Sequence, residues 1–268
     1  LESGLVGFEK RSNNEKNRVY IQVKGMVRDL PRDLVYLINQ NEWQIQKLNS
    51  YINIGIDHSY VYNHGSGTMN LNARANAFTN DYDFSSVQYT ALNKLSVAKF
   101  DISTRLFGQL GYGNNLPSES MLFASGANPE ELMENKYTRS MGFVPPSWGK
   151  YSTVTNHFNA GGGLNLRGYS GYLLAQTDNT GSIIYNYKGT TGASASAEIE
   201  FGKYFSFLNI KKLNNSIKIS PYLFADAGAI NTNQNGKAIT MSKLMVDARN
   251  EATLSIQKWG PLFGLKPL

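Results

Sequence analysis

The sequence lacks cysteine altogether and is poor in charged residues. With no cysteine among its 268 residues, the chain can form neither a disulfide framework nor a thiolate metal site. Charged residues make up 17% of the chain, below the roughly 25% of an average globular domain. By contrast, it has 16 tyrosines, 13 phenylalanines and 25 glycines. This composition favours strands and turns over charged helices.

Long apolar runs and clustered charge are also missing. No apolar run approaches the roughly 18 residues of a transmembrane helix. The first stretch, "LESGLVGFEKRSNNEK", lacks both an initiating Met and the pattern of a signal peptide, so we interpret the chain as a fragment of a longer protein. The net charge of +6 comes from scattered lysines and arginines, and the sequence therefore predicts no nucleic-acid partner.

The dominant pattern is an alternation of apolar and polar residues with a period of two. In the stretch "SIKISPYLFAD", Leu223 and Ala225 share one face, whereas Phe224 and Asp226 share the other. The stretches "GASASAEIEFG", "KFDISTRLFGQLGY" and "TMNLNARANAF" follow the same rule. Each predicts a strand with one apolar and one polar face, and turn clusters such as "NHGSG" and "KLNNS" separate the strands.

Helical patterning is confined to the stretch "NPEELMENKY". Asn128 suits the N-cap, Pro129 suits the first helical position, and Glu130 and Glu131 suit the first turn. The stretch predicts a short helix within a loop.

Two architectures fit strands of this kind. In a soluble sandwich or binding module the apolar faces meet in a core, whereas in an outer-membrane barrel they face lipid and the polar faces line a wet lumen. Strands of about ten residues with Lys, Asp, Arg and Glu on their polar faces favour the barrel. Tyr60, Tyr62 and Tyr112, at strand ends, suit an interfacial girdle.

Three motifs occur in order: "LRGY" within the stretch "GGGLNLRGYSGY", then "EIEFG", then "PYLFADAG". This trio resembles the Omp85 superfamily of outer-membrane proteins. The resemblance implies an all-β fold, an antiparallel transmembrane β-barrel of sixteen strands, of which residues 1–268 are an incomplete portion. It also implies a long loop at about 113–175 that carries the Arg-Gly-Tyr tip into the lumen. The residues of this loop-pinning motif are Arg167, Gly168, Tyr169, Glu200, Phe201, Phe224, Asp226 and Gly228.

The physical chemistry of these residues fits a pinned loop. The planar guanidinium of Arg167 suits carboxylates, and Glu200 and Asp226 both fall on polar strand faces by alternation. Phe224 offers a ring for the guanidinium to stack on, and Gly168 lets the loop tip turn sharply. We therefore expect Arg167 to hold the loop inside the barrel.

The sequence offers no catalytic constellation, no metal site and no cofactor fingerprint. His58 and His64 lie near Asp57, but a solvated turn explains them better than a metal site does, and His157 stands alone. Ser170 lacks the spacing of a nucleophile elbow.

The resemblance implies a protein of the bacterial outer membrane that inserts or exports proteins there. Its partners are then the membrane lipid and other complex subunits or client proteins. An alternative comes from the stretch "GANPEELMENKYTRSMGFVP", which looks like the barrel of large Bacteroidetes proteins with an M1-type metallopeptidase-like region. In that case this chain is a membrane anchor, and any enzyme activity belongs to a region upstream.

Overall fold

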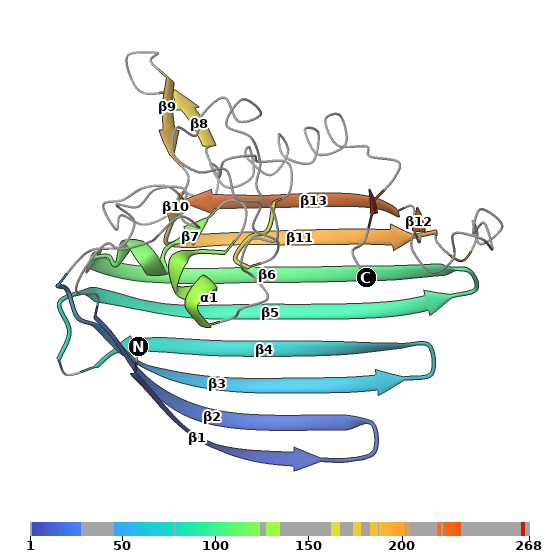
Figure 1. Ribbon diagram of the computed structural model, residues 1–268, viewed down its shortest axis with the longest axis horizontal. Helices are drawn as coiled ribbons and strands as arrows, with labels where there is room; N and C mark the ends of the chain where they lie inside the picture. The colour runs from blue at the N-terminus through green and yellow to red at the C-terminus, as the bar shows by residue number, and fades with distance from the viewer. Residues whose placement is uncertain are drawn as a thin grey trace.

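The computed structural model is dominated by one antiparallel sheet of eight strands in the order β1-β2-β3-β4-β5-β6-β11-β13 (Figure 1). The residues that the structure describes are 2–27, 46–77, 79–123, 127–134, 162–166, 174–177, 183–186, 188–201, 203, 219–220, 222–231 and 264–265. The strands of the sheet are β1 (Glu2–Arg11), β2 (Glu15–Met26), β3 (Asn49–Tyr62), β4 (Gly65–Asn76), β5 (Asp83–Val97), β6 (Phe100–Asn115), β11 (Thr191–Glu200) and β13 (Tyr222–Asn231).

The remaining elements are short. They are the 3-10 helix η2 (Ser118–Ser120), β7 (Leu122–Phe123), α1 (Pro129–Glu134), β8 (Leu174–Thr177), β9 (Ile183–Asn186), β10 (Lys188–Gly189), β12 (Ile219–Ser220) and β14 (Gly264–Leu265). Three two-stranded pairs form among them, β10 with β7, β12 with β14 and β8 with β9. No helix among the described residues has the length and apolar character needed to cross a membrane. The predicted all-β antiparallel fold is confirmed; over the described residues β1 and β13 are the two edges of the main sheet.

The period-two alternation gives the sheet two chemically distinct faces. We call the face that carries Tyr51, Arg74 and Asp226 the inner face, and the face that carries Ile54 and Val87 the outer face. Cross-strand neighbours keep to one face, and one row of the outer face runs through Ile21, Ile54, Ala73, Val87 and Leu110. The four stretches in which alternation predicted a strand contribute to β4, β6, β11 and β13, and Phe224 and Asp226 share the inner face as expected.

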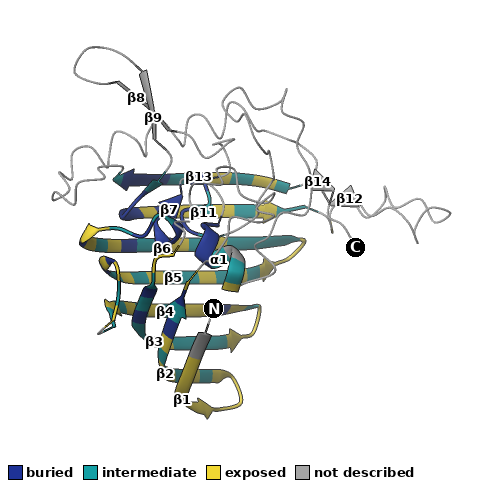
Figure 2. Ribbon diagram, turned by 60° about the vertical axis from the view of Figure 1, so that its left-hand side comes forward, coloured by how far each residue is buried: buried dark blue, intermediate teal, exposed yellow. Residues whose placement is uncertain are grey.

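Burial is inverted relative to a soluble sheet protein, in which the apolar face is the covered one (Figure 2). Large exposed apolar side chains run along the outer face: Val6, Phe8, Val19, Ile21, Val23, Ile54, Ile56, Met69, Leu71, Val87, Tyr89, Leu106, Leu110, Tyr112, Ile199 and Leu223. The inner face is polar, yet it is the one that α1 lies over. The buried apolar cluster of Phe107, Leu122, Leu164, Leu166 and Ile230 lies on this inner side.

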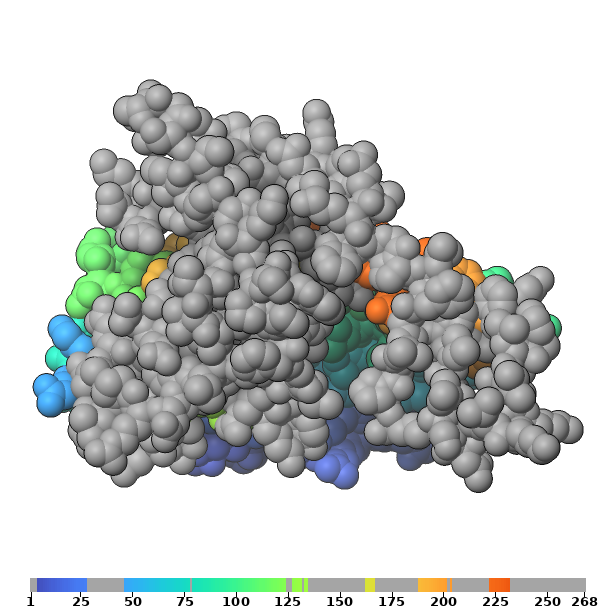
Figure 3. Space-filling model, turned by 45° about the horizontal axis from the view of Figure 1, so that its top comes forward, coloured from blue at the N-terminus to red at the C-terminus, as the bar shows by residue number. Residues whose placement is uncertain are grey.

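The two ends of the sheet differ in their connections. At one end, the turn end, β1 and β2 are joined by residues 12–14, β3 and β4 by Asn63 and His64, and β5 and β6 by Ala98 and Lys99. A longer connection there, residues 201–221, joins β11 to β13. At the opposite loop end, residues 27–48, 77–82 and 116–190 join the strands. In the space-filling view, the first strands (blue) and β13 (orange) appear at separate places on one face (Figure 3).

Replacing Ala98 by glycine should stabilise the protein. Ala98 has a φ of 52° in its two-residue turn, a conformation that costs an L-residue with a Cβ about 1–2 kcal/mol. Glycine removes that strain at the cost of greater freedom in the unfolded chain, so we expect a net gain of about 0.5–1 kcal/mol in the free energy of unfolding. Urea titration measures it. Lys99→Gly is the matched control and should lower stability, because Lys99 has no positive φ to relieve.

Candidate functional site

The long connection between β6 and β11 lies partly across the inner face of the sheet. We call its described residues 117–123, 127–134 and 162–166 the strap. One end of the strap, η2 and α1, contacts the inner face of β2, β3 and β4. The other end, residues 162–166, contacts β6 and β11. The strap is therefore the main feature that the described part of the chain places on the polar face.

The helix α1 forms where the sequence predicts it. The Glu131 backbone N–H donates to Asn128 Oδ1 at 2.8 Å, and the Asn128 N–H donates back to Glu131 Oε2 at 3.0 Å, which is a capping box. Asn128 Nδ2 also donates to the carbonyl of Met121 at 3.0 Å. These bonds fix the start of α1 against η2 and β7, and Glu130 and Glu134 of α1 point at the sheet.

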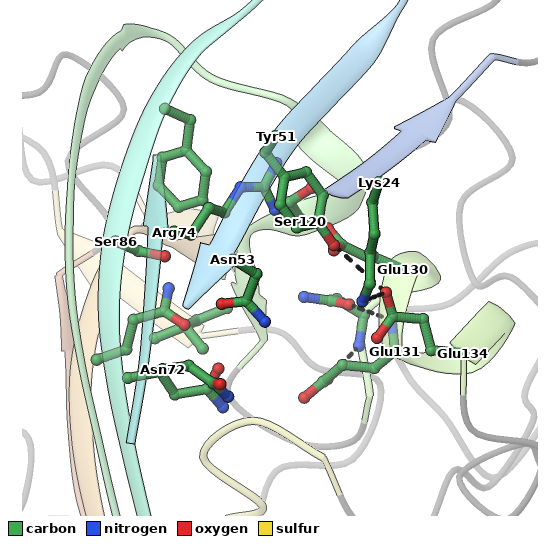
Figure 4. Close-up of a pocket in the computed structure, with 15 residues that line it drawn as sticks. Lys24, Tyr51, Asn53, Asn72, Arg74, Ser86, Ser120, Glu130, Glu131 and Glu134 are labelled. Atoms are coloured by element: carbon green, nitrogen blue, oxygen red, sulfur yellow. Dashed lines mark hydrogen bonds and ion pairs between the residues drawn. The ribbon is translucent and has the colours of Figure 1, made fainter. Parts of the chain in front are cut away.

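A buried ion pair joins α1 to the sheet (Figure 4). Arg74 Nη1 on β4 lies 2.9 Å from Glu130 Oε2, with side-chain exposures of 9% and 11%. The Arg74 guanidinium lies 3.7 Å from the centroid of the Tyr51 ring and 5.1 Å from that of Phe84. The Tyr51 hydroxyl donates to Glu130 Oε1. Glu130 thus has a cation and a hydroxyl donor from two neighbouring strands.

Further polar contacts surround this pair. Arg74 Nη2 donates to Asn49 Oδ1 at 2.8 Å, and Asn49 Nδ2 donates to Glu119 Oε1 at 2.7 Å and to Ser120 Oγ at 3.0 Å. Lys24 on β2 pairs with Glu134 at the last position of α1. Cations from β2 and β4 therefore pair with carboxylates of α1, and the amide of Asn49 on β3 bonds the carboxylate of η2.

Burial and charge affect three of the strap carboxylates differently. Burial disfavours ionised Glu130, but the charge of Arg74, hydrogen bonds from Ser120 and Tyr51, and the charge of Lys24 outweigh it and lower the pKa of Glu130. Burial raises the pKa of Glu119 and of Glu131, because their hydrogen bonds compensate only in part.

Neutralising Glu119 should stabilise the protein above acidic pH. Because the pKa of Glu119 is raised in the fold, stability falls as pH rises from 4.5 through the raised value, and the whole penalty is present above it. Glu119→Gln removes the charge and keeps an oxygen for Asn49. We expect the variant to gain stability over the wild type across this window, with the difference shrinking below pH 4.5. Urea titrations from pH 4 to pH 8 measure it.

Glu130→Gln is the contrasting variant. The pKa of Glu130 is lowered, so its contribution is present above pH 4.5 and is lost as pH falls through the folded-state value. This variant should be less stable than the wild type at neutral pH. If Glu119→Gln is also less stable than the wild type at pH 7.5, then burying the charged carboxylate of Glu119 does not destabilise the protein.

The second end of the strap is held through backbone carbonyls. Arg105 on β6 donates to the carbonyls of Gly163 at 2.5 Å and of Leu164 at 3.3 Å, and Ser194 Oγ on β11 donates to Leu164 O at 2.7 Å. The Gly163 N–H donates to Glu131 Oε1 at 3.0 Å. This last bond links the two ends of the strap.

Apolar packing completes this second end. Leu164 is 0% exposed and Leu166 is 1% exposed. A Cβ on Gly228 would lie 2.8 Å from Leu166 Cδ2, and one on Gly192 would lie 3.1 Å from Leu164 Cδ2. The two glycines therefore make room for the two leucines against β11 and β13.

The predicted motif residues that fall in β11 and β13 share the inner face. Asp226 is 1% exposed, pairs across the strands with Ser196 and interacts electrostatically with Arg105. Glu198 lies opposite Phe224, and Glu200 lies opposite Tyr222. Phe201 makes an edge contact with Phe100 at 5.6 Å between ring centroids. Arg167, Gly168 and Tyr169 lie outside the described residues, so their pinning role stays a prediction.

Register separates the two predicted carboxylate partners. Glu200 is four positions from Ser196, the cross-strand partner of Asp226. Four positions correspond to a distance of about 13 Å along the strands. Leu166, the residue before Arg167, packs at Gly228, two positions from Asp226 on the side away from Glu200. Asp226 is therefore the nearer carboxylate to the point where the described loop ends.

Sequence reasoning missed the residues that hold the strap. Arg74 and Arg105 were recognisable as polar-face cations, but alternation does not say what lies opposite them. No sequence motif includes Asn49, Tyr51 or Ser194. An arginine on an inner strand face, together with an acidic helix in a long loop, is the one signal that points to such a contact.

A metal site is not assembled in the described residues, where no group of three or more His, Asp or Glu side chains converges. Asp57 lies on the inner face and accepts from Asn70, whereas His58 lies on the outer face beside Asn17. The adjacent pair thus points to opposite sides of the sheet. His157 lies outside the described residues.

No protein-family model matches the chain, and a search of the curated proteins finds no match.

Proposed function

We propose that the chain is part of an outer-membrane β-barrel of Omp85 type that inserts proteins into the bacterial outer membrane or exports them across it. The observation that carries the proposal is the inverted sheet: its apolar face is exposed and its polar face is covered by a loop. In water such a face is unfavourable, but against lipid it is the expected arrangement.

Aromatic residues on the outer face support a membrane setting. Tyr60 and Tyr62 on β3 lie near the turn end and cover Gly67 and Gly65 of β4, whose added Cβ atoms would lie 2.3 Å and 2.5 Å from the tyrosine rings. Tyr112 is 69% exposed near the loop end. Aromatic rings at both ends of an apolar band suit the two interfaces of a membrane.

The unequal ends of the sheet support an orientation. Outer-membrane barrels have short turns on the periplasmic side and longer loops outside. The two-residue and three-residue turns of the turn end fit the periplasmic side, and the connections at residues 27–48 and 116–190 fit the outside. Residues 201–221 depart from this pattern, because they form a long connection at the turn end.

The position of residues 162–166 supports the Omp85 type in particular. The resemblance implies a loop that enters the lumen with an Arg-Gly-Tyr tip, and the residues just before Arg167 pack on the inner face. Leu166 sits at Gly228, the last residue of the Phe-x-Asp-x-Gly motif. We propose that Arg167 continues along this face toward Asp226.

Reconstitution of the full-length protein tests the function. The protein, purified in detergent, is incorporated into liposomes, and the folding rate of an unfolded client barrel is followed by its gel mobility. We expect faster client folding than in empty liposomes and in liposomes with heat-denatured protein.

Two results would contradict the proposal. A protein that stays in solution after detergent removal, without entering liposomes, is not a membrane barrel. A protein that enters liposomes but neither accelerates client folding nor exports a client is not an insertase or exporter. Zinc-dependent peptidase activity in that second case would favour the anchoring alternative.

A further inference from the structure

The two ends of the strap are held by different kinds of interaction. We propose that α1 is a releasable arm, which leaves the inner face while residues 162–166 stay anchored. Opening then uncovers part of the inner wall without unfolding the sheet. The inference goes beyond the proposed function, because it concerns the strap itself and not what the barrel transports.

The α1 end is held by charge, and its polar atoms are incompletely satisfied. Arg74 and Glu130 form the central ion pair, and Lys24 and Glu134 form a second one. Yet Arg74 Nε and Glu119 Oε2 are buried without a hydrogen-bond partner in the described part of the chain. Unsatisfied buried polar groups each oppose docking, so the net free energy that holds α1 is smaller than the number of contacts indicates.

The 162–166 end is held by apolar burial. Leu164 and Leu166 join Phe107, Leu122 and Ile230 in the buried cluster, and burial of these apolar side chains stabilises the packed segment. Arg105 and Ser194 bond to carbonyls in this segment. Leaving the face would expose two leucines, which makes this end the more firmly attached.

The two ends of the strap also touch each other. In the described residues α1 is linked to the anchored end by the Glu131–Gly163 hydrogen bond at 3.0 Å and by the contact of Gly162 with Ala127. Leu122, which precedes α1, packs with Leu164 and Leu166 in the buried cluster, so we expect it to stay with the anchored end. Gly162 and Gly163 have φ values of 80° and 47°, in a region that glycine enters at little cost. The anchored segment therefore begins at two residues that can change conformation as α1 leaves.

Release of α1 uncovers an amide-lined wall. The pocket between α1 and the sheet is lined by neutral side chains of β3, β4, β5 and β6, namely Asn53, Asn72, Ser86, Gln88 and Gln109 (Figure 4). With α1 docked, these groups lie beneath Glu130, Glu131 and Glu134. With α1 released, they form a polar surface on the inner face, together with the two cations Lys24 and Arg74 that α1 leaves without their carboxylates.

The absence of natural cysteine allows each end to be probed separately. Ser120→Cys reports on the α1 end and Ser194→Cys on the anchored end, and both serines are 6% exposed. Ser12→Cys, in an exposed turn, gives the reference rate of labelling. Maleimide labelling of the folded full chain is measured with and without Glu130→Gln, and Asp101→Asn, which breaks an exposed pair with Lys203, is the matched control.

We expect Glu130→Gln to raise the labelling rate of the Ser120→Cys probe more than tenfold, with Ser194→Cys unchanged and Asp101→Asn without effect on either probe. Equal acceleration of both probes overturns the inference, because the strap then leaves as one body. No acceleration of either also overturns it, since charge then does not hold α1. Glu134→Gln, at a carboxylate with 33% side-chain exposure, is the milder second variant and should give the same selective change if Glu130→Gln loses its far-UV circular dichroism.

Discussion

Val87→Arg should destabilise the protein in lipid by about 2–4 kcal/mol if it is the membrane barrel that we propose, because that is the cost of a basic residue on the lipid face near the middle of a barrel. Val87 lies on the outer face of β5, is 49% exposed, and has Ala73 and Leu110 as cross-strand neighbours. On a soluble protein, an exposed Val→Arg change is nearly neutral. The measurement is reversible urea unfolding of the reconstituted full-length protein in lipid bilayers.

Gln88→Arg is the matched control because Gln88 is the next residue of β5 and lies on the inner face. There the added charge meets a polar pocket, so we expect a change of less than about 1 kcal/mol. If both variants unfold at the wild-type urea concentration, the outer face does not contact lipid. If Gln88→Arg is the more harmful of the two, the inner and outer faces are assigned the wrong way round.

Gly228→Val should cost about 1–3 kcal/mol, the range measured for overpacking a well-filled site. A Cβ at this position would lie 2.8 Å from Leu166 Cδ2, 2.9 Å from the Ala193 carbonyl oxygen and 3.0 Å from Ser194 Cβ. The backbone carbonyl cannot move easily, so Leu166 must leave its place. We therefore expect both a lower free energy of unfolding and faster labelling of the Ser194→Cys probe.

Gly108→Val separates this steric effect from the general effect of valine in a strand. Gly108 lies on the outer face of β6, and a Cβ there would meet nothing within 4 Å. Valine suits strands, so Gly108→Val should be neutral or stabilising. If Gly228→Val and Gly108→Val lower the free energy of unfolding equally, Gly228 does not make room for Leu166.

Much of the sheet could be predicted because alternation is a local property. A strand with one apolar face must place its apolar residues two apart, and a slip of one residue reverses the whole pattern. That rule placed Asp226 and Phe224 on one face, and the register confirms it. The cap at Asn128 was equally local, because its partner Glu131 is three residues away.

The contacts of the strap could not be predicted because they join distant parts of the chain. Arg74 and Glu130 lie 56 residues apart, and nothing in their spacing says that the loop folds over β4. The sequence likewise does not say that β11 pairs with β6 across residues 116–190. The Omp85 resemblance and the pairing of Arg167 remain predictions.

The unequal lengths of the connections between neighbouring strands also affect how the sheet assembles. From β1 to β6 most neighbours are joined by short connections, whereas β6 and β11 must find each other across residues 116–190. Each doubling of a flexible loop adds about 0.6 kcal/mol of closure entropy, so long-range pairs form later than hairpins. Docking of residues 162–166 on β6 divides that long connection into shorter ones. We therefore expect the strap to act during folding as an intermediate point of closure, which brings β11 and β13 to a sheet that the hairpins have already begun.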